Sequence, residues 1–291
     1  MDNRSEIREF LASRRAKVTP EQAGLGGLHS GHRRVPGLRR EEVALLAGVS
    51  VEYYARLERG QLGGVSDSVL NAIADALQLN EAERQHLSDL ARTAGASPRT
   101  ARRRRTTEEV RPGILAILES LTESPAFVRN GRLDLLATNE LGRAMFAPVF
   151  AEAARPANLA RFNFLDPAAQ TFYPDWNRSA NTTVALLRTE AGRDPYNSKL
   201  TELIGELTTR SEEFSRRWAA HDVRLHHTGV KHFQHPEVGP LELRFEAMPL
   251  PADPGLTLTV YTAEQGSPTY DALRLLASWR ATMEAAEESA G

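Results

Sequence analysis

The stretch LRREEVALLAGVSVEYYARLERG, residues 38–60, is the most informative part of the sequence for the structure of the first part of the chain. Its apolar residues recur at intervals of three and four, which predicts amphipathic helices at 39–47 and 51–59. Gly48 lies between them and can take the positive φ that a tight turn between helices needs. The stretch therefore predicts two short helices joined by a turn, which is the pattern of a helix-turn-helix.

The helical period divides the side chains of this stretch between an inward and an outward face. Ala44 is small enough to let the two helices approach closely, and the apolar residues expected to share a core are Val43, Leu46, Val49, Tyr54 and Leu57. The outward face predicts a DNA-binding surface formed by Arg39, Arg40, Ser50, Val51, Glu52, Tyr53, Arg56 and Arg59. The structural alternative is an ordinary helical hairpin inside a core.

The second helix carries the candidates for base recognition, because a recognition helix enters the major groove with its N-terminal end first. Arg56 matches the acceptors of guanine, Glu52 the amino group of cytosine, and Val51 the methyl group of thymine. We expect Arg40 and Arg59 to bind phosphates, which positions the helix without specifying a sequence.

The two adjacent tyrosines of the second helix have different expected roles. Tyr54 lies three residues before Leu57, so it should point into the core and hold the recognition helix. Tyr53 should lie on the outer face, where its hydroxyl can reach a phosphate or a base edge.

Three further helical patterns surround this stretch, at 5–16, 67–78 and 81–92. Good N-cap residues precede three of the five expected helices, namely Ser50, Ser66 and Asn80. Five short helices in so few residues predict a compact all-α helix-turn-helix domain at 1–95.

The composition bounds the function. The chain has 291 residues, 41% of them apolar, which is enough for two domains, and it has no cysteine, which excludes disulfides and thiol catalysis. It shows neither a signal peptide nor an apolar run long enough for a membrane span, so we expect a cytoplasmic protein with no membrane partner. Residues 1–105 hold 18 basic and 13 acidic side chains although the net charge of the chain is −2. This asymmetry favours a polyanion as the partner of the first part.

The remainder is expected to be a basic linker at 96–109, a second domain at 110–282 and a disordered tail at 283–291. The segment 125–139 reads as a strand, an Asn-Gly turn and a strand. The other β-like runs of this domain lie at 222–234, 239–250 and 255–264. Its helical patterns lie at 112–123, 141–149, 165–220 and 271–279. The expected fold class is α+β, with a five-stranded antiparallel sheet and helices against one face.

The residues 38–60 resemble a helix-turn-helix of the XRE type. Further stretches resemble one branch of that family, which joins this domain to an MmyB-like ligand-binding domain; they are FLASRR (10–15), PAFVRNGRLDLLATN (125–139), FLDPAAQTFYPDW (164–176), EEFSRRWAAHDV (212–223), GVKHFQHPEVGPLEL (229–243) and VYTAEQGSP (260–268). The resemblance implies a PAS-like domain that holds a fatty-acid-like or other apolar ligand. Where many XRE proteins have glutamine this chain has Arg40, which favours a phosphate contact there.

The ligand site can be predicted only as a set of candidates, because aromatic residues spaced along helices also form cores. Pockets are mostly apolar with a few polar anchors, and a carboxylate-headed ligand would need an arginine. The candidates are Arg161, Phe164, Trp176, Arg188, Trp218 and Phe233, with Arg178 as a further arginine.

Five histidines fall between His221 and His235, yet we predict no metal site, because the segment has no cysteine ligand and no HExxH motif. The resemblance makes His221 and His235 framework residues. Catalytic constellations and phosphate-binding loops are also missing from the sequence, so we expect no cofactor and no enzymatic activity.

The sequence thus predicts a sequence-specific transcriptional regulator that binds double-stranded operator DNA as a homodimer and senses a small apolar effector. The alternative is a protein-interaction or antitoxin-like module that uses the helix-turn-helix as a scaffold, with the two tyrosines as partner anchors.

Overall fold

The computed structural model describes residues 3–26, 35–94, 109–151, 156–220 and 227–290. The chain forms two compact units. The first comprises 1–104, 188–205 and 216–225, and the second comprises 105–187, 206–215 and 226–291. The first unit thus includes two segments that the sequence assigned to the second domain. Most of the expected linker at 96–109 lies outside the described residues.

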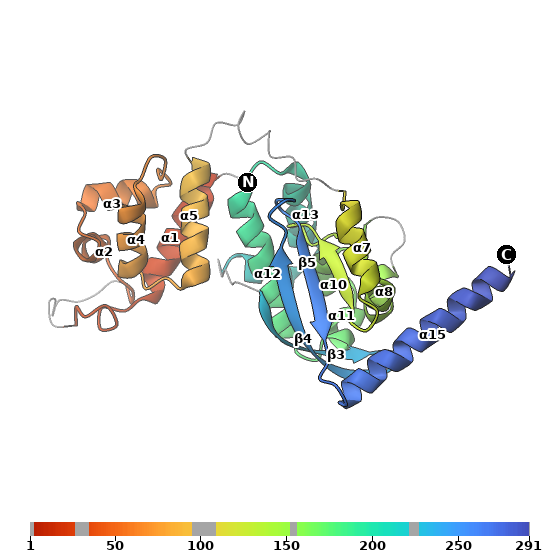
Figure 1. Cartoon of the computed structure of the whole chain (residues 1–291). Coiled ribbons are helices and arrows are strands. Elements are labelled where there is room, and N and C mark those ends of the chain that lie inside the picture. The colour runs from red at the N-terminus through yellow and green to blue at the C-terminus, as the bar shows by residue number, and fades with distance from the viewer. Residues whose placement is uncertain (1–2, 27–34, 95–108, 152–155, 221–226, 291) are drawn as a thin grey trace. The chain divides into compact units, whose positions relative to one another are not determined.

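Five helices form the N-terminal part of the first unit, as predicted (Figure 1, red to orange). They are α1 (Asn3–Lys17), α2 (Arg40–Leu46), α3 (Val51–Glu58), α4 (Asp67–Ala76) and α5 (Glu81–Ala94). Their apolar faces meet in one core, which gives the compact all-α domain that the sequence predicted.

The ends of α3 follow from particular residues. Gly48 has a φ of +65°, and Ser50 Oγ accepts a hydrogen bond of 3.1 Å from the backbone N–H of Tyr53. Gly60 has a φ of +93°, and a Cβ there would lie 2.7 Å from the carbonyl oxygen of Arg4. A side chain at position 60 would therefore push α1 away from the end of α3.

The core contains Val43, Tyr54 and Leu57, all fully buried. Leu46, which we expected beside them, is 38% exposed, so that expectation was wrong. Ala47 follows Val43 by four residues and takes the inward position instead.

A buried carboxylate ties three helices together. Glu58, at the end of α3, is only 2% exposed. It accepts a 2.7 Å hydrogen bond from Nε of Arg15 on α1 and a second, short one from Nε of Arg40 on α2. Arg15 also donates to the backbone carbonyl of Leu38 at 2.8 Å. These contacts fix α3 relative to α1 and α2.

The second unit is built on a five-stranded antiparallel sheet in the order β2-β1-β5-β4-β3, which confirms the predicted sheet. Its strands are β1 (Ala126–Arg129), β2 (Leu135–Thr138), β3 (Thr228–His235), β4 (Gly239–Pro249) and β5 (Thr257–Thr262). The part of the first C-terminal run at 222–226 lies outside the described residues.

The remaining helices are α7 (Pro112–Ser120), α8 (Glu140–Met145), α9 (Ala147–Phe150), α10 (Leu159–Leu165), α11 (Ala168–Phe172), α12 (Trp176–Arg193), α13 (Ser198–Arg210), α14 (Glu212–Trp218) and α15 (Pro268–Ala290). On one face of the sheet, an aromatic cluster joins α8 to α11 and to the strands through Phe146, Phe172, Phe233 and Tyr261. On the other face, Ile114 and Leu118 of α7 pack against Val128 and Leu258. Helices therefore cover both faces, whereas the sequence suggested one.

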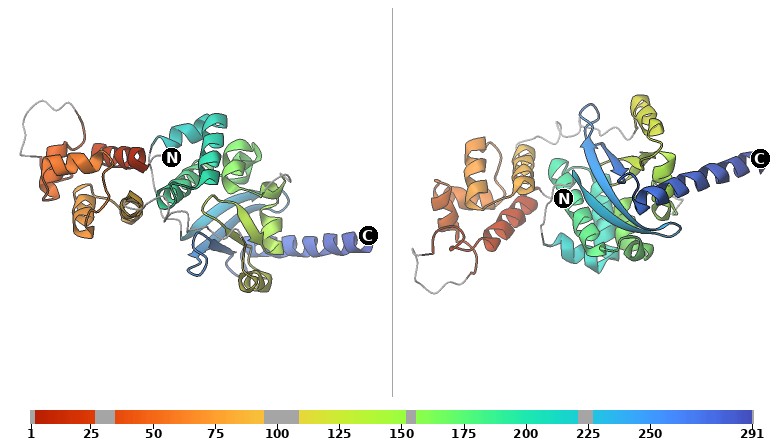
Figure 2. Two further views of the ribbon diagram at one scale, coloured as in Figure 1. Left: turned by 90° about the horizontal axis from the view of Figure 1, so that it is seen from above. Right: turned by 60° about the horizontal axis from the view of Figure 1, so that its bottom comes forward.

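The last helix is longer than expected. Figure 2 shows α15 extending beyond the sheet, and its bounds include most of the segment predicted to be a disordered tail at 283–291. None of the described helices combines the length and the hydropathy that a membrane span requires.

The burial of the two tyrosines predicts unequal effects on stability. Tyr54→Ala should lower the free energy of unfolding by about 3–5 kcal/mol, because it leaves a large cavity in the core. Tyr53→Ala should cost much less, since Tyr53 is only partly buried. Thermal melts of both variants test this, and a larger loss for Tyr53→Ala would show that the assignment is reversed.

The Glu58 cluster predicts a second stability effect. Glu58→Ala leaves Arg15 without its carboxylate and should cost about 3 kcal/mol or more in denaturant unfolding. Glu41→Ala is the matched control, because Glu41 pairs with Arg39 at the surface and should cost about 1 kcal/mol or less. Equal losses for the two variants would contradict the role given to the cluster.

Candidate functional sites

The outward face of α3 is open to solvent at its N-terminal end. Val51 is 42% exposed, and Ser50, Glu52 and Arg56 are also exposed. The guanidinium carbon of Arg56 lies 4.8 Å from the centroid of the Tyr53 ring. This stacking holds the Arg56 side chain against the helix surface while its N–H groups stay available.

Tyr53 contacts both the helical core and the outer face of α3. Its ring packs partly against the helical core and also lies under Arg56. The sequence placed Tyr53 wholly on the outer face, because the helical period does not show that a side chain can contribute to both sides.

The remaining arginines of the expected surface differ in their partners. Arg40 is bound to the buried carboxylate of Glu58, although its side chain is still 56% exposed. Arg39 lies 3.4 Å from Glu41 Oε1, and Arg59 is exposed at the C-cap of α3. Arg40 therefore has an internal structural partner in addition to the phosphate contact expected from the sequence.

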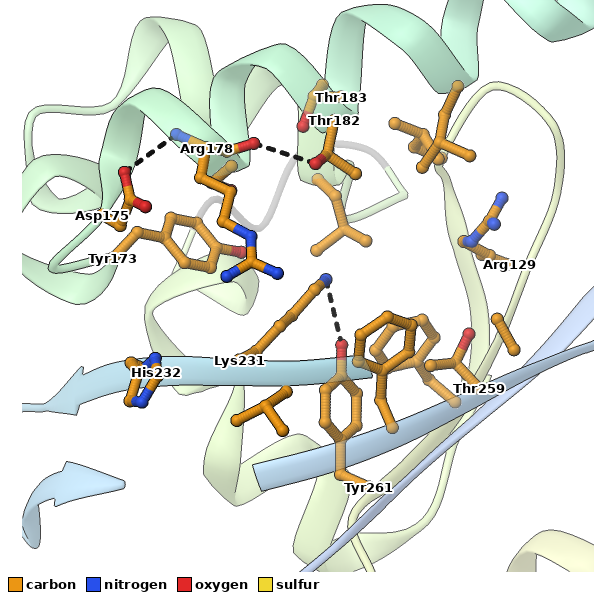
Figure 3. Close-up of a pocket in the computed structure, with 18 residues that line it drawn as sticks. Arg129, Tyr173, Asp175, Arg178, Thr182, Thr183, Lys231, His232, Thr259 and Tyr261 are labelled. Carbon is orange, nitrogen blue, oxygen red and sulfur yellow. Dashed lines mark hydrogen bonds between the residues drawn. The ribbon is translucent and has the colours of Figure 1, made fainter. Parts of the chain in front are cut away.

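A cavity lies in the second unit, on the inner face of the sheet, which is the face that carries the aromatic cluster. Its lining comes from β1, β3, β4 and β5, from the β1–β2 turn, from α10, and from α12 with the turn before it. The residues are Phe127, Arg129, Leu133, Leu159, Tyr173, Asp175, Arg178, Ser179, Thr182, Thr183, Leu186, Val230, Lys231, His232, Phe245, Ala247, Thr259 and Tyr261. Figure 3 shows Lys231 and Tyr261 rising from the strands toward Arg178 on the helix. The pocket thus combines apolar side chains with charged and polar groups that come from both the sheet and α12.

Two polar groups of the cavity come from the strands, Lys231 on β3 and Thr259 on β5. The Nζ of Lys231 lies 3.5 Å from the hydroxyl oxygen of Tyr261 and 5.0 Å from the ring centroid of Phe245. Thr259 is 4% exposed, and its hydroxyl has no hydrogen-bond partner among the described residues. Both the Lys231 amine and the Thr259 hydroxyl could form a hydrogen bond with a ligand.

Burial sets the protonation of these groups. Burial and, to a smaller extent, the positive charges of Arg129 and Arg178 together lower the pKa of Lys231 to about 7. Burial also raises the pKa of Tyr173 and of Tyr261 above the usual value for tyrosine. Near neutral pH the pocket therefore holds protonated phenols and an amine that exchanges between its two charge states.

Asp175 is the one carboxylate among the described residues that line the cavity. Its Oδ1 accepts a 3.1 Å hydrogen bond from the backbone N–H of Arg178, as an N-terminal cap of α12 does. His232 also lines the cavity, and its Nε2 lies 3.1 Å from Glu242 Oε2.

The six ligand residues expected from the sequence do not line this cavity. Four lie in the second unit: Arg161 pairs with Glu206 at 2.8 Å, Phe164 and Trp176 make a ring contact, and Phe233 is buried in the aromatic cluster. Two lie in the first unit, where Arg188 binds the Glu6 carboxylate, the carbonyl of Trp218 and the Trp218 ring. Only the further arginine, Arg178, reaches the cavity.

Sequence reasoning missed Lys231, Thr259 and Arg129. A signal for them exists, because side chains two apart on a strand share a face. Lys231 shares a face with buried Phe233, Thr259 with Tyr261, and Arg129 with Phe127. A polar residue at an inward position of a buried strand face marks a cavity.

The described histidines of this segment differ, because His227 and His232 are exposed whereas His235 has a structural role. His235 is buried, its Nε2 lies 3.2 Å from the carbonyl oxygen of Ala144, and its Nδ1 accepts from the backbone N–H of Glu237 at 3.2 Å. No three metal-ligating side chains converge within the described ranges. His221 lies outside the described residues, so its expected framework role stays a prediction.

Comparison with known protein families identifies both the N-terminal and the C-terminal part of the chain. The profile of the MmyB-like transcription regulator ligand binding domain matches residues 110–276, more than half of the chain, and that of a helix-turn-helix domain matches residues 6–87. No curated protein matches the chain. Because the match covers most of the chain, the protein belongs to the family of regulators that carry the MmyB-like ligand-binding domain, and it joins this domain to an N-terminal helix-turn-helix of the XRE type.

Proposed function

We propose that the protein is a sequence-specific transcriptional regulator that binds operator DNA through α3 and responds to a small apolar, fatty-acid-like effector in the cavity of its sheet. The observation that carries the DNA part is the exposed outward face of α3, where Arg56 of the last turn lies stacked on Tyr53. This architecture favours a regulator over an enzyme, and we propose that the protein acts in the cytoplasm, with the DNA.

The chemistry of the exposed face fits a major-groove surface. An arginine can donate two hydrogen bonds to guanine, a carboxylate can accept one from cytosine, and an apolar side chain can contact the methyl group of thymine. Arg56, Glu52 and Val51 supply these three groups from one helix face. Arg59 and the exposed part of Arg40 would contact phosphates, with Arg40 still held by Glu58.

We further propose that the protein acts as a homodimer on two half-sites and that the second domain is PAS-like. A five-stranded antiparallel sheet with helices across an apolar cavity supports the PAS-like assignment. An effector changes DNA binding only if it binds the DNA-competent state and the other state with different affinity.

The second candidate is a protein-interaction module, favoured by exposed apolar residues on α2. Leu45 is 66% exposed and lies close in the chain to exposed Leu46. Tyr54 cannot serve as a partner anchor, as that alternative supposed, because it is fully buried. A gel shift with genomic fragments at moderate salt separates the two: a retarded fragment supports the regulator, and a stable protein partner without a retarded fragment supports the module.

The two arginines of α3 predict different binding defects. Arg56→Ala should weaken binding to the selected operator by about 1–3 kcal/mol and relax the preference for one base pair. Arg59→Ala should weaken binding to operator and scrambled DNA alike, because phosphate contacts do not depend on sequence. Equal losses of Arg56→Ala on both DNAs, measured by fluorescence anisotropy, would refute the base contact.

The effector part predicts that the purified protein retains a small molecule. Mass spectrometry of an organic extract should find a ligand in the wild type and much less in Leu186→Trp, which fills the cavity from its half-buried wall. Leu275→Trp, at an exposed position of α15, is the matched control and should retain the ligand. Empty extracts from wild-type protein would contradict the sensor.

A further inference from the structure

One helix belongs to both units of the chain. α12 runs from Trp176 to Arg193, and the boundary between the units falls after Leu187. Its first part lines the cavity with side chains between Arg178 and Leu186, and in Figure 3 it forms the wall opposite the strands. Its last turns lie in the first unit, with the DNA-binding helices. Because α12 contains no proline that would kink it, a displacement of its first part is passed on to its last turns.

The last turns of α12 are held by charged groups. Arg188 is fully buried and donates from Nη1 to Glu6 Oε1 on α1 and from Nη2 to the backbone carbonyl of Trp218. At the end of the helix, Nε of Arg193 donates to Asp89 Oδ2 on α5 at 3.2 Å. Two helices of the DNA-binding part, α1 and α5, thus bind α12 through ion pairs.

A glycine lets α5 approach α12 closely. A Cβ at Gly192 would lie 2.7 Å from Cε1 and 2.8 Å from Nδ1 of His86. On the same side, Oγ1 of Thr93 lies 3.4 Å from the carbonyl oxygen of Gly192. Glycine is a poor helix former, so the close approach explains its place here. Position 192 has no room for a side chain while the two helices are in contact.

His86 makes this contact costly to keep closed. Its imidazole is fully buried, and its ring centroid lies 4.9 Å from that of Phe10 on α1. Neither ring nitrogen has a hydrogen-bond partner among the described residues, and Nε2 lies 3.6 Å from Glu6 Oε1, which is beyond hydrogen-bonding distance. Burying a polar group without a hydrogen bond costs free energy, which is recovered when water reaches the ring.

The buried ion pair has a similar effect on the free energy of the contact. The attraction between two buried charges is largely offset by the cost of removing them from water, and this cost is also recovered when they separate. Glu6, His86 and Arg188 therefore form a junction that opens at a lower cost than an apolar core of the same size. A contact of this kind can have two arrangements that a ligand can bias.

α1 joins this junction to the recognition helix. Arg15 of α1 donates to the buried carboxylate of Glu58 at the end of α3. The backbone of Arg4, which precedes Glu6 by two residues, packs so closely on Gly60 that a Cβ there would lie 2.7 Å from the Arg4 carbonyl oxygen. A shift of α1 at Glu6 therefore changes the support of α3.

Resting on the effector function proposed above, we propose that α12 couples the cavity to the DNA-binding surface. Occupancy of the cavity displaces α12 and shifts its junction with Glu6 and His86 between a closed and an open arrangement, and this changes the affinity of α3 for DNA. An effector acts in this way because it binds the two arrangements with different affinity.

Fluorescence anisotropy of the full-length protein on a duplex selected by the wild type tests the proposal, with decanoate as the probe for the cavity. Decanoate should change the DNA affinity of the wild type by about fivefold or more. Gly192→Ala pushes His86 away, so it should still bind DNA and decanoate, but decanoate should change its DNA affinity by about twofold or less. Gly205→Ala, on α13, is the matched control, because a Cβ there meets nothing within 4 Å, and it should respond as the wild type does.

Hydrogen exchange tests the same coupling without decanoate or DNA. Ala247→Leu adds bulk to the cavity from β4, opposite α12, and should change the exchange of the amides around Glu6 and His86 by a factor similar to that seen for DNA. Ala116→Leu makes the same enlargement at an exposed position of α7 and should leave these amides unchanged. In the Gly192→Ala background, Ala247→Leu should have no further effect on them. Thermal melts establish that each variant is folded.

The outcomes separate this inference from the proposed function. The inference is overturned if folded Gly192→Ala keeps the wild-type response, if Ala247→Leu leaves the exchange of α1 and α5 unchanged, or if the wild type binds decanoate and DNA independently. If the exchange changes as expected but the protein retards no DNA, the coupling through α12 stands and the proposed regulator fails. If decanoate does not bind, the exchange measurement decides the inference, and the proposed class of effector fails.

Discussion

The DNA-binding surface depends on the contacts that the buried carboxylate of Glu58 makes with two arginines. It lies at the end of α3 and is bound by arginines of α1 and α2, so one side chain fixes the recognition helix against both neighbours. Tyr54 and Leu57 fill the core beneath it. A helix held at its C-terminal end and along its inner face presents its N-terminal half in one orientation, which reading a base pair requires.

In the second unit, as in α3, some side chains pack the core while others form the candidate site. The aromatic cluster around Phe146 and Phe233 fills one part of the inner sheet face, and the cavity occupies another. Basic side chains stand where the strand pattern alone would place apolar ones. The sheet therefore contributes charged side chains as well as aromatic rings to the cavity.

The sequence predicted the elements well, because local patterns determine them. Periods of three and four residues located the five N-terminal helices, and the turn chemistry of Gly48, Ser50 and Gly60 placed the ends of α3. Strand alternation with an Asn-Gly turn predicted the sheet. Leu46 was placed wrongly in the core, because a seven-residue helix has too few turns to fix which side chains face inward.

The sites were less predictable, because contacts between distant residues form them. Arg40 and Glu58 are 18 positions apart, and Arg188 and Glu6 are 182 apart, so neither ion pair is visible in a local pattern. Aromatic residues spaced along helices pointed to core and cavity alike, and Phe164, Trp176 and Phe233 proved to lie away from the cavity. The inward position of Lys231 on β3 was the available clue, since it needs only the strand register.

If the exposed face of α3 reads bases, a change in that face should change the selected DNA sequence. Wild-type protein and the Glu52→Arg variant would each select bound duplexes from a random DNA pool. We expect two half-sites about one helical turn apart, with a change from cytosine to guanine at one position of each half-site in the variant. An unchanged consensus, or no consensus for the folded wild-type protein, would contradict it.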